Sequence, residues 1–323
     1  MRVFVTGGAG YIGSVCVEEL LNTGHAVTVY DDLSEGHRSA VDRRAQFVLG
    51  QPEEGNHILD AVNKAQPDAI MHFAANALVG ESMTNPGKYF RNNVANGLKL
   101  LEAAIAARVK KFVFSSTCAI YGLPDRVPMT EDLPLRPINP YGESKAMFEK
   151  MLHWYQQLKG LEYVSLRYFN AAGASEHFGE HHRVETHLIP RVLTVALGQA
   201  PHCEIYGTNY PTPDGTCIRD YIHIVDLAQA HLLALLPGKQ GFYNLGNGDG
   251  YSVRQVIQTC EKVTGKEIPA IEKPRRPGDP PRLVASANKA VRELGWKPEH
   301  PKLEDIVVSA WRWHQRHPNG YPD

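Results

Sequence analysis

Hydrophobic and polar positions follow a regular rhythm along the first half of the chain. Short apolar runs of strand length lie at residues 2–6, 26–30, 69–73, 111–115 and 163–167. Amphipathic stretches of helical length lie between them, for example at residues 11–23, 93–107 and 142–159. Strands that alternate with helices pair in parallel through right-handed crossovers and carry helices on both faces. The pattern therefore predicts an α/β fold with a doubly wound parallel sheet.

The rhythm changes after residue 171, where Pro and Gly become denser and the order of elements becomes irregular. We interpret residues 171–323 as a smaller, mixed α/β lobe that is added to a first domain of residues 1–170. A segment near residues 219–246 is expected to return to the first domain. The Pro-rich stretch at 275–282 precedes another helical pattern at 287–294, so we interpret it as an ordered loop.

A glycine-rich segment, TGGAGYIG, lies where the first strand is predicted to end and the first helix to begin. Gly7, Gly10 and Gly13 permit a tight turn and let the backbone approach a pyrophosphate at the helix N-terminus. Asp31 closes the next strand, where its carboxylate can bind an adenosine ribose and would repel a 2′-phosphate. The motif predicts a Rossmann-type domain that binds NAD rather than NADP; the alternative is a tight turn without a ligand.

Two further motifs carry the chemistry of a proton transfer. SSTCAIYG begins at Ser115, directly after a predicted strand, and PYGESK begins a predicted helix. Tyr141 and Lys145 are four residues apart and share one helical face. A nearby ammonium and an oxidised nicotinamide would both favour the phenolate of a tyrosine, whose ordinary pKa is about 10. Thr117 can relay a hydrogen bond to Tyr141. The alternative is a surface Tyr and Lys on an amphipathic helix.

Composition limits the classes of partner. A formal net charge of −1 gives no general attraction to nucleic acid or to an anionic membrane. No apolar run approaches the roughly 20 residues of a membrane span, and no signal peptide is recognised. The five cysteines have no C-x-x-C spacing, so we expect free thiols, a cytoplasmic protein and no zinc–thiolate site. The HFGEH string at 177–181 resembles a metalloprotease motif, but Gly179 interrupts it. We therefore expect a solvated loop there and no metal.

Several blocks occur in order across both predicted parts of the chain: HFAA at 72–75, VGES at 79–82, NNV at 92–94, RYFNAAGA at 167–174, THLIP at 186–190 and YPTPDGTCIRDYIH at 210–223. With them the chain resembles, from Met1 almost to Asp323, the extended short-chain dehydrogenase/reductase family. It is most similar to the members that invert C4 of a UDP-hexose through a 4-keto intermediate. The resemblance implies an NAD-binding domain, a UDP-sugar-binding lobe and a homodimer.

The resemblance also implies roles for individual residues. Tyr141, Lys145 and Thr117 correspond to the catalytic residues. The implied cofactor contacts are Gly7, Gly10, Tyr11, Ile12, Gly13, Asp31, Asp32, Ser34, Gln51, Phe73, Ala74, Ala75, Asn92, Ser115, Tyr141, Lys145 and Tyr168. The implied substrate contacts are Thr117, Tyr141, Asn170, His187, Leu188, Tyr206, Arg219, Arg276 and Asp279. Arginine forks suit a diphosphate better than lysines do, although Arg219 could instead form a structural ion pair with Asp220 or Asp226.

Three positions modify this picture. Gln51 stands where the family usually has an Asp that binds adenine, which predicts weaker cofactor binding. Leu283 occupies the position whose bulk, in the family, controls whether an N-acetyl group fits at C2 of the sugar. Cys118 and Ala119 replace the Asp-Glu pair of the 4,6-dehydratases, so dehydration is not expected. A 4-epimerase of UDP-N-acetylhexosamines, UDP-pentoses or UDP-glucuronate remains an alternative, as does a protein that senses NAD without turnover.

Overall fold

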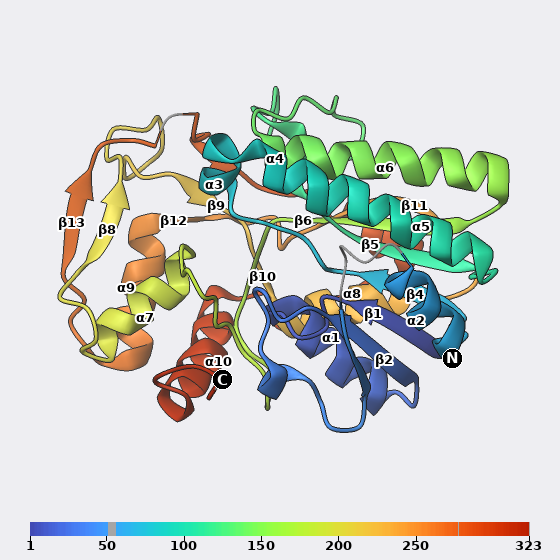
Figure 1. Ribbon diagram of the computed structural model, residues 1–323. Coiled ribbons are helices and arrows are strands. Elements are labelled where there is room, and N and C mark those ends of the chain that lie inside the picture. The colour runs from blue at the N-terminus through green and yellow to red at the C-terminus, as the bar shows by residue number, and fades with distance from the viewer. Residues whose placement is uncertain (51–55, 277, 323) are drawn as a thin grey trace.

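The computed structural model describes residues 1–50, 56–276 and 278–322, and it contains a large sheet flanked by helices with a smaller lobe at one end (Figure 1). Seven parallel strands form the large sheet in the order β11-β6-β5-β4-β1-β2-β3. Their bounds are β1 Arg2–Thr6, β2 Ala26–Asp31, β3 Gln46–Leu49, β4 Ala69–His72, β5 Lys111–Thr117, β6 Glu162–Tyr168 and β11 Gly241–Leu245. The predicted doubly wound α/β sheet is confirmed.

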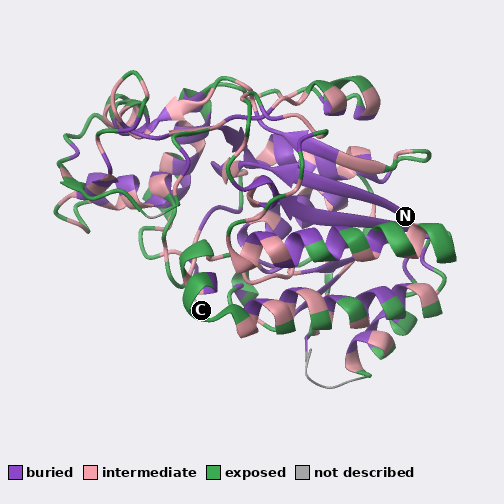
Figure 2. Cartoon of the chain, turned by 90° about the horizontal axis from the view of Figure 1, so that it is seen from above, coloured by how far each residue is buried: buried purple, intermediate pink, exposed green. Residues whose placement is uncertain are grey.

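Helices cover both faces of this sheet, as the side-chain pattern of the strands requires. In β1, Phe4 packs with one group of helices, while Val3 and Val5 point to the opposite face. The first group contains α2 His57–Ala65, α5 Gly97–Ala106 and α6 Pro140–Lys159. The second contains α1 Tyr11–Asn22 and α8 Ile224–Ala234, which pack against each other. Figure 2 shows the strands buried between helices whose outer faces are exposed.

The helix expected at 93–107 begins earlier and is not regular. Here α4 Pro86–Tyr89 leads into the π-helical segment η2 Phe90–Asn96, and α5 follows. The Asn93 side chain donates to the carbonyl of Asn76 at 3.0 Å and to the hydroxyl of Ser144 at 3.0 Å. Because the wider π turns often occur at functional sites, η2 is a candidate part of the functional site.

The chain after residue 170 builds the smaller lobe and also returns to the large sheet. The lobe contains α7 Leu188–Ala196, α9 Val253–Thr264 and α10 Leu303–Arg316, which share one apolar core. Its short strands are β7 Asn170–Ala172, β8 Cys203–Tyr206, β9 Ile218–Arg219, β10 Tyr221–His223, β12 Tyr251–Ser252, β13 Ala270–Lys273 and β14 Arg282–Leu283. Two elements of this part of the chain instead belong to the large sheet: α8 packs on α1, and β11 pairs with β6 at the edge of the sheet.

Smaller elements complete the described chain: the 3₁₀ turns η1 Arg38–Ala40 and η3 Cys118–Tyr121, α3 Val79–Thr84, and the π-helical segment η4 Ala290–Leu294. Within the described ranges, no helix is both long enough and apolar enough to cross a membrane.

A buried carboxylate attaches α6 to the sheet. Glu149 on α6 accepts hydrogen bonds from the hydroxyls of Ser116 and Ser165, both at 2.7 Å, and from the Arg167 guanidinium, with Nε at 3.0 Å from Oε1. The Arg167 and Glu149 side chains are only 3% and 7% exposed. A charged pair so deeply buried is tolerated because its hydrogen bonds are satisfied by neighbours on two strands. It therefore fixes the position of α6 along β5 and β6.

Candidate active site

The glycine loop between β1 and α1 is shaped by backbone contacts that only glycine permits. Gly7 has φ of 74°, and a Cβ atom there would lie 2.4 Å from the amide nitrogen of Ala74. A Cβ on Gly13 would lie 2.1 Å from the Gly7 carbonyl oxygen. At Gly10, the N-cap of α1, the nearest atom to such a Cβ is 3.4 Å away. The loop therefore leaves space at the N-terminus of α1, where free N–H groups favour a pyrophosphate.

Asp31 lies at the end of β2 and takes part in the shape of this loop. Its Oδ2 accepts from the backbone N–H of Ala9, and its Oδ1 accepts from that of Leu33, both at 2.9 Å. Burial raises the pKa of Asp31, while these two hydrogen bonds act in the opposite direction. The carboxylate thus joins β2 to the glycine loop, and its remaining lone pairs are the ones that can accept ribose hydroxyls.

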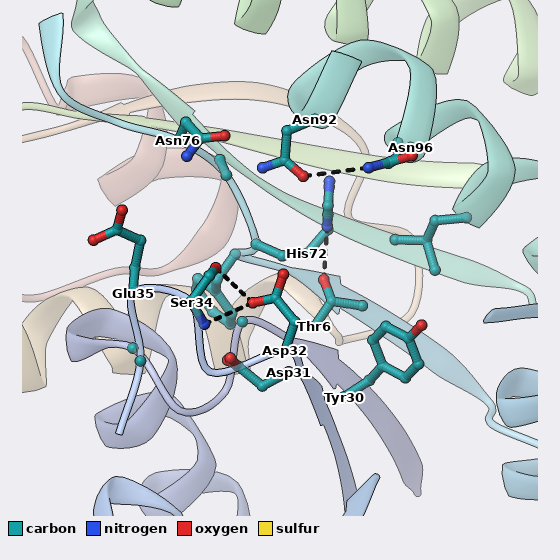
Figure 3. A pocket seen from close by; sticks show the side chains of 18 of the residues that line it. Thr6, Tyr30, Asp31, Asp32, Ser34, Glu35, His72, Asn76, Asn92 and Asn96 are labelled. Atoms are coloured by element: carbon teal, nitrogen blue, oxygen red, sulfur yellow. Dashed lines mark hydrogen bonds between the residues drawn. The ribbon is translucent and has the colours of Figure 1, made fainter. Parts of the chain in front are cut away.

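A pocket opens over the carboxyl ends of β1, β2 and β4, where ligands bind in open α/β sheets. Figure 3 shows Asp31, Asp32 and Ser34 on one side of it and the amides of Asn92 and Asn96, from η2, on the other. The expected cofactor contacts that line it are Gly7, Gly10, Asp31, Asp32, Ser34, Phe73, Ala74, Ala75 and Asn92. The pocket thus combines a helix N-terminus, acidic groups and amides. These hydrogen-bond donors and acceptors fit the phosphates and riboses of NAD.

The pocket also contains residues that sequence reasoning missed: Thr6, Tyr30, Glu35, Gly36, Ile58, His72, Asn76, Asn96, Gly97, Lys99 and Leu100. Asn96 and Lys99 follow Asn92 by four and seven residues, so helical spacing alone could have placed them on the same face. His72 is neutral inside the protein, because burial lowers its pKa to about 3, and its Nδ1 lies 2.7 Å from the Thr6 hydroxyl. Nothing in the local pattern indicates Ile58.

Other expected cofactor contacts lie outside this pocket. Tyr11 is buried and its hydroxyl donates to the Gly173 carbonyl at 2.7 Å, so its side chain connects α1 to the segment after β7. Ile12 packs into the core beside α8, and Gly13 contacts the glycine loop. Gln51 falls outside the described residues. The remaining four, Ser115, Tyr141, Lys145 and Tyr168, gather at the neighbouring carboxyl ends of β5 and β6.

Tyr141 and Thr117 meet at the end of β5. Thr117 forms the N-cap of η3, where its Oγ1 accepts from the Ala119 N–H at 3.1 Å, and it also hydrogen-bonds to the Tyr141 phenol. Burial raises the pKa of Tyr141 to about 12, and the Thr117 hydrogen bond opposes this increase only in part. The expected pairing of these two side chains is present. The phenol would need additional positive charge to ionise near neutral pH.

Lys145 lies one helical turn after Tyr141 on α6, and its side chain reaches β5. Its ammonium donates to the Ser115 carbonyl at 2.8 Å and lies 4.8 Å from the centre of the Phe114 ring. Burial lowers the pKa of Lys145 to about 7. What the structure supplies is a buried ammonium that exchanges its proton close to neutral pH.

The expected substrate residues form two contacts around the turn at 276–279. Arg219 is 13% exposed and forms an ion pair with Asp279, rather than with Asp220 or Asp226. Asp220 instead accepts from the backbone N–H groups of Asn247, Gly248 and Ala285. The Arg276 guanidinium lies 4.0 Å from the centre of the Tyr206 ring. The backbone N–H of Asp279 donates to the carbonyl of Arg276 at 3.3 Å, so one turn holds both groups together.

Contacts of β9 and β14 link Arg219 and Asp279 to the residues beside Thr117. Leu283 pairs in register with Arg219 and packs into the cluster that contains Cys118, the residue after Thr117. Asn170 on β7 donates its side-chain amide to the carbonyl of Asp220, next to Arg219, at 2.7 Å. Arginine, amide and apolar side chains therefore approach the Tyr141 end of the sheet from the smaller lobe.

Leu188 and His187 lie at the N-terminus of α7. Leu188 packs against the core of the smaller lobe, while His187 is the N-cap residue and its Nδ1 lies 2.9 Å from Glu185 Oε1. Burial lowers the pKa of His187, but Glu180 and Glu185 more than offset this and raise it to about 9. His187 therefore carries a positive charge at neutral pH, which suits an anionic ligand.

The HFGEH segment is not a helix, as expected, but the expectation of a solvated loop is wrong. Phe178, Gly179 and Glu180 are buried. The Gly179 N–H donates to the hydroxyl of Tyr321 at 3.1 Å, and a Cβ atom on Gly179 would lie 2.4 Å from the Trp313 ring. The end of the chain covers this loop, and such cover cannot be inferred from the local polar composition.

The model of the NAD dependent epimerase/dehydratase family matches residues 3–246. The chain belongs to this family. A UDP-glucose 4-epimerase of Halalkalibacterium halodurans is 51% identical over 328 residues, which cover 99% of this chain and 98% of that protein.

Solved structures of this NAD dependent epimerase/dehydratase family agree over the whole chain. The UDP-glucose 4-epimerase of Brucella ovis in complex with NAD has a TM-score of 0.93 and 46% identity, over 97% of this chain and 98% of that one. The enzyme of Bifidobacterium longum in complex with NAD⁺ and UDP has a TM-score of 0.95 and 39% identity, over 99% and 100%. The likeness therefore includes both the large sheet and the smaller lobe.

Burial of the charged form of Lys145 should lower the free energy of unfolding. Its pKa of about 7 in the folded protein lies below the 10.5 that is usual for lysine, so folding releases a proton between these values. This penalty is fully present below pH 7 and disappears as pH rises above about 10. We expect Lys145→Met to melt at least as high as wild type at pH 7, with the advantage shrinking toward pH 10.

Thermal unfolding of both proteins across pH 6–10 measures this difference. Lys150→Met, on the exposed side of the same helix, is the matched control and should show no such pH dependence. A Lys145→Met variant whose melting temperature falls below wild type by the same amount at every pH would contradict the burial cost.

Proposed function

We propose that this chain interconverts UDP-glucose and UDP-galactose by inverting the hydroxyl at C4, with NAD as its cofactor. The observation that carries the proposal is the contact of Tyr141 with Thr117 at the carboxyl end of β5, beside a pocket that fits NAD. Full-length similarity to UDP-glucose 4-epimerases supports the same reaction. Bound NAD would supply the chemistry of taking a hydride from C4 and returning it.

In this proposal Tyr141 removes the proton of the C4 hydroxyl, directly or through Thr117, while the C4–H bond gives up its hydride. The product of this half-reaction is a flat 4-keto sugar. After the 4-keto sugar has rotated in the cleft, hydride returns to the opposite face of C4. Tyr141 then gives the proton back to the C4 oxygen. Lys145 would add positive charge near this exchange, since it lies on α6 one turn after Tyr141 and its ammonium contacts the carbonyl of Ser115, two residues before Thr117.

The smaller lobe would hold the UDP part and leave the sugar free to turn. Arg219, which pairs with Asp279, and Arg276, which lies over the Tyr206 ring, are the cations suited to the diphosphate. Tyr206 offers a ring beside which uracil can pack, and Asn170 offers an amide for sugar or phosphate oxygens. Asp279, which pairs with Arg219, can accept from a hydroxyl. The sugar can rotate within the cleft only if the nucleotide is bound firmly and the sugar loosely.

The role of Tyr141 predicts a specific kinetic defect. Tyr141→Phe keeps the ring and loses the hydroxyl, so we expect turnover to fall by at least ~100-fold, the low end for loss of a general base. NAD binding and the melting temperature should stay close to wild type. Rates with UDP-galactose, together with an NAD titration, measure both effects. Tyr155→Phe on the same helix is the control, and a Tyr141→Phe enzyme with wild-type turnover would refute the assignment.

The sugar preference would be set beside Leu283. Its side chain packs into the cluster with Cys118 and Phe169, next to the catalytic Thr117. A leucine leaves more space than a tyrosine and less than a cysteine. We therefore propose that the plain hexoses are the main substrates and that the N-acetylated pair is converted more slowly.

Substitutions at Leu283 test this preference. Leu283→Tyr should suppress conversion of UDP-N-acetylglucosamine selectively, and Leu283→Cys should raise it, each by roughly 10-fold or more, because pocket contacts of this size discriminate by about 1–3 kcal/mol. The measured quantity is the ratio of kcat/KM for the two substrates. If both variants keep the wild-type ratio, Leu283 does not control access.

We propose in addition that two copies of the chain form a dimer through α5 and α6. These helices pack together (Figure 1), and their outer side carries the exposed apolar side chains of Leu98, Met147, Trp154 and Leu158. The last three follow helical spacing along one face of α6. An exposed stripe of this kind is typical of a surface that another protein covers.

The free thiols of all five cysteines support a cytoplasmic location, which cell fractionation would test.

A charge within this stripe should separate the dimer. We expect wild type to have twice the chain mass in solution and Trp154→Glu to sediment as a monomer, because the carboxylate would be desolvated in the interface. Analytical ultracentrifugation measures the difference. His153→Glu, on another side of α6, should remain dimeric. A monomeric wild-type protein at micromolar concentration would contradict the proposal.

A further inference from the structure

The loop between β7 and α7 places four metal-ligating side chains at one point. Residues 180–187 read EHHRVETH. Glu180, His182, Glu185 and His187 each contribute one ligand atom, and these four atoms all lie within 4.8 Å of one another. We refer to these four residues as the Glu/His cluster. Their spacing, E-x-H-x-x-E-x-H, comes from a folded loop and from no regular helix or strand.

Distances within the Glu/His cluster are close to those around a bound cation. Glu180 Oε1 lies 3.1 Å from His182 Nε2 and 3.1 Å from His187 Nδ1. His187 Nδ1 lies 2.9 Å from Glu185 Oε1. Ligands at 2.0–2.2 Å from Zn²⁺ in a tetrahedron are separated by about 3.3–3.6 Å. Most of these atoms would therefore need to move by only a few tenths of an ångström to surround the ion.

The chemistry of the Glu/His cluster selects one class of ion. Two imidazole nitrogens with two carboxylate oxygens suit Zn²⁺ and its first-row neighbours, while Mg²⁺ and Ca²⁺ prefer oxygen ligands alone. The Glu180 side chain is 4% exposed, and that of Glu185 is 22% exposed. Two carboxylates that are so little hydrated require nearby positive charge. A divalent cation that contacts all four side chains at once would supply this charge in place of the proton that His187 otherwise carries.

We propose that Glu180, His182, Glu185 and His187 form a binding site for a divalent first-row metal ion, with Zn²⁺ as the occupant. Four ligands from the protein complete a tetrahedron, so the site is structural and leaves no position open for a reacting water. His187 would use Nδ1 for the ion, which leaves Nε2 for other partners. The HFGEH string shares only Glu180 with this site, so the sequence motif did not indicate it.

The position of the loop says what such an ion would do. Arg183, inside the cluster's span, donates to the carbonyls of Leu33 and Gly36 at 3.1 and 3.2 Å. These carbonyls follow Asp31, at the edge of the NAD pocket, while His187 begins α7 of the smaller lobe. An ion that fixes the shape of residues 180–187 would therefore fix the position of the smaller lobe relative to the NAD-binding domain.

Metal binding can be measured without any substrate. The purified full chain is treated with a chelator, dialysed and titrated with ZnCl₂ by calorimetry, and with CoCl₂ by visible absorption. We expect one equivalent of Zn²⁺ to bind, a rise in melting temperature with Zn²⁺, and the intense visible bands of tetrahedral Co²⁺. His182→Gln and Glu185→Gln should each lose at least ~10-fold in affinity, the least that even an outer-shell change costs, together with the Co²⁺ bands.

Glu176→Gln is the matched control, because Glu176 is an exposed carboxylate four residues before the cluster. It should bind Zn²⁺ as tightly as wild type does. Melting temperatures measured without metal show whether each variant is folded, and either folded variant suffices for the comparison. The proposal is overturned if wild type binds no stoichiometric Zn²⁺, or if folded His182→Gln and Glu185→Gln bind it as tightly as wild type. Neither outcome depends on the epimerase activity.

Discussion

The buried carboxylate of Glu149 is the contact on which the rest of the site depends. It joins α6 to Ser116 on β5 and to Ser165 and Arg167 on β6, so one residue ties the helix to two neighbouring strands. Tyr141 and Lys145 lie on the same helix, about two turns and one turn before Glu149, respectively. A shift of α6 would leave the Arg167 charge unpaired inside the protein, which is far costlier than the loss of a surface contact. The position of α6 is therefore strongly determined.

Desolvation acts on the two reactive side chains in opposite directions. Burial raises the pKa of Tyr141 to about 12 and lowers that of Lys145 to about 7, because in both cases it disfavours the charged form. The protein alone thus keeps the phenol protonated and the ammonium close to neutrality. An oxidised nicotinamide adds positive charge at this place, so the proposed proton transfer is linked to the presence of the cofactor.

The smaller lobe is attached where it can influence both ligands. The turn at 276–279 holds Arg276 and Asp279, and β14 carries Leu283 to the residues beside Thr117. On the other side, Arg183 reaches the carbonyls after Asp31 at the NAD pocket. Backbone and side-chain contacts therefore connect the lobe both to the residues beside Thr117 and to the loop after Asp31.

Local spacing in the sequence was sufficient for the alternation of strands and helices, for the glycine loop with Asp31, and for Tyr141 with Lys145 on one helix, because each depends on neighbours within a few residues. The glycine loop, Asp31 and the family blocks identified fewer than half of the residues that line the pocket. The sequence by itself did not place β11 beside β6, turn Lys145 toward Ser115, insert the π-helical segment η2, bury Gly179 under Trp313 or bring the Glu/His cluster together. These features were decided by the tertiary structure, because they arise from contacts between distant segments and from loop shapes that no periodic pattern encodes.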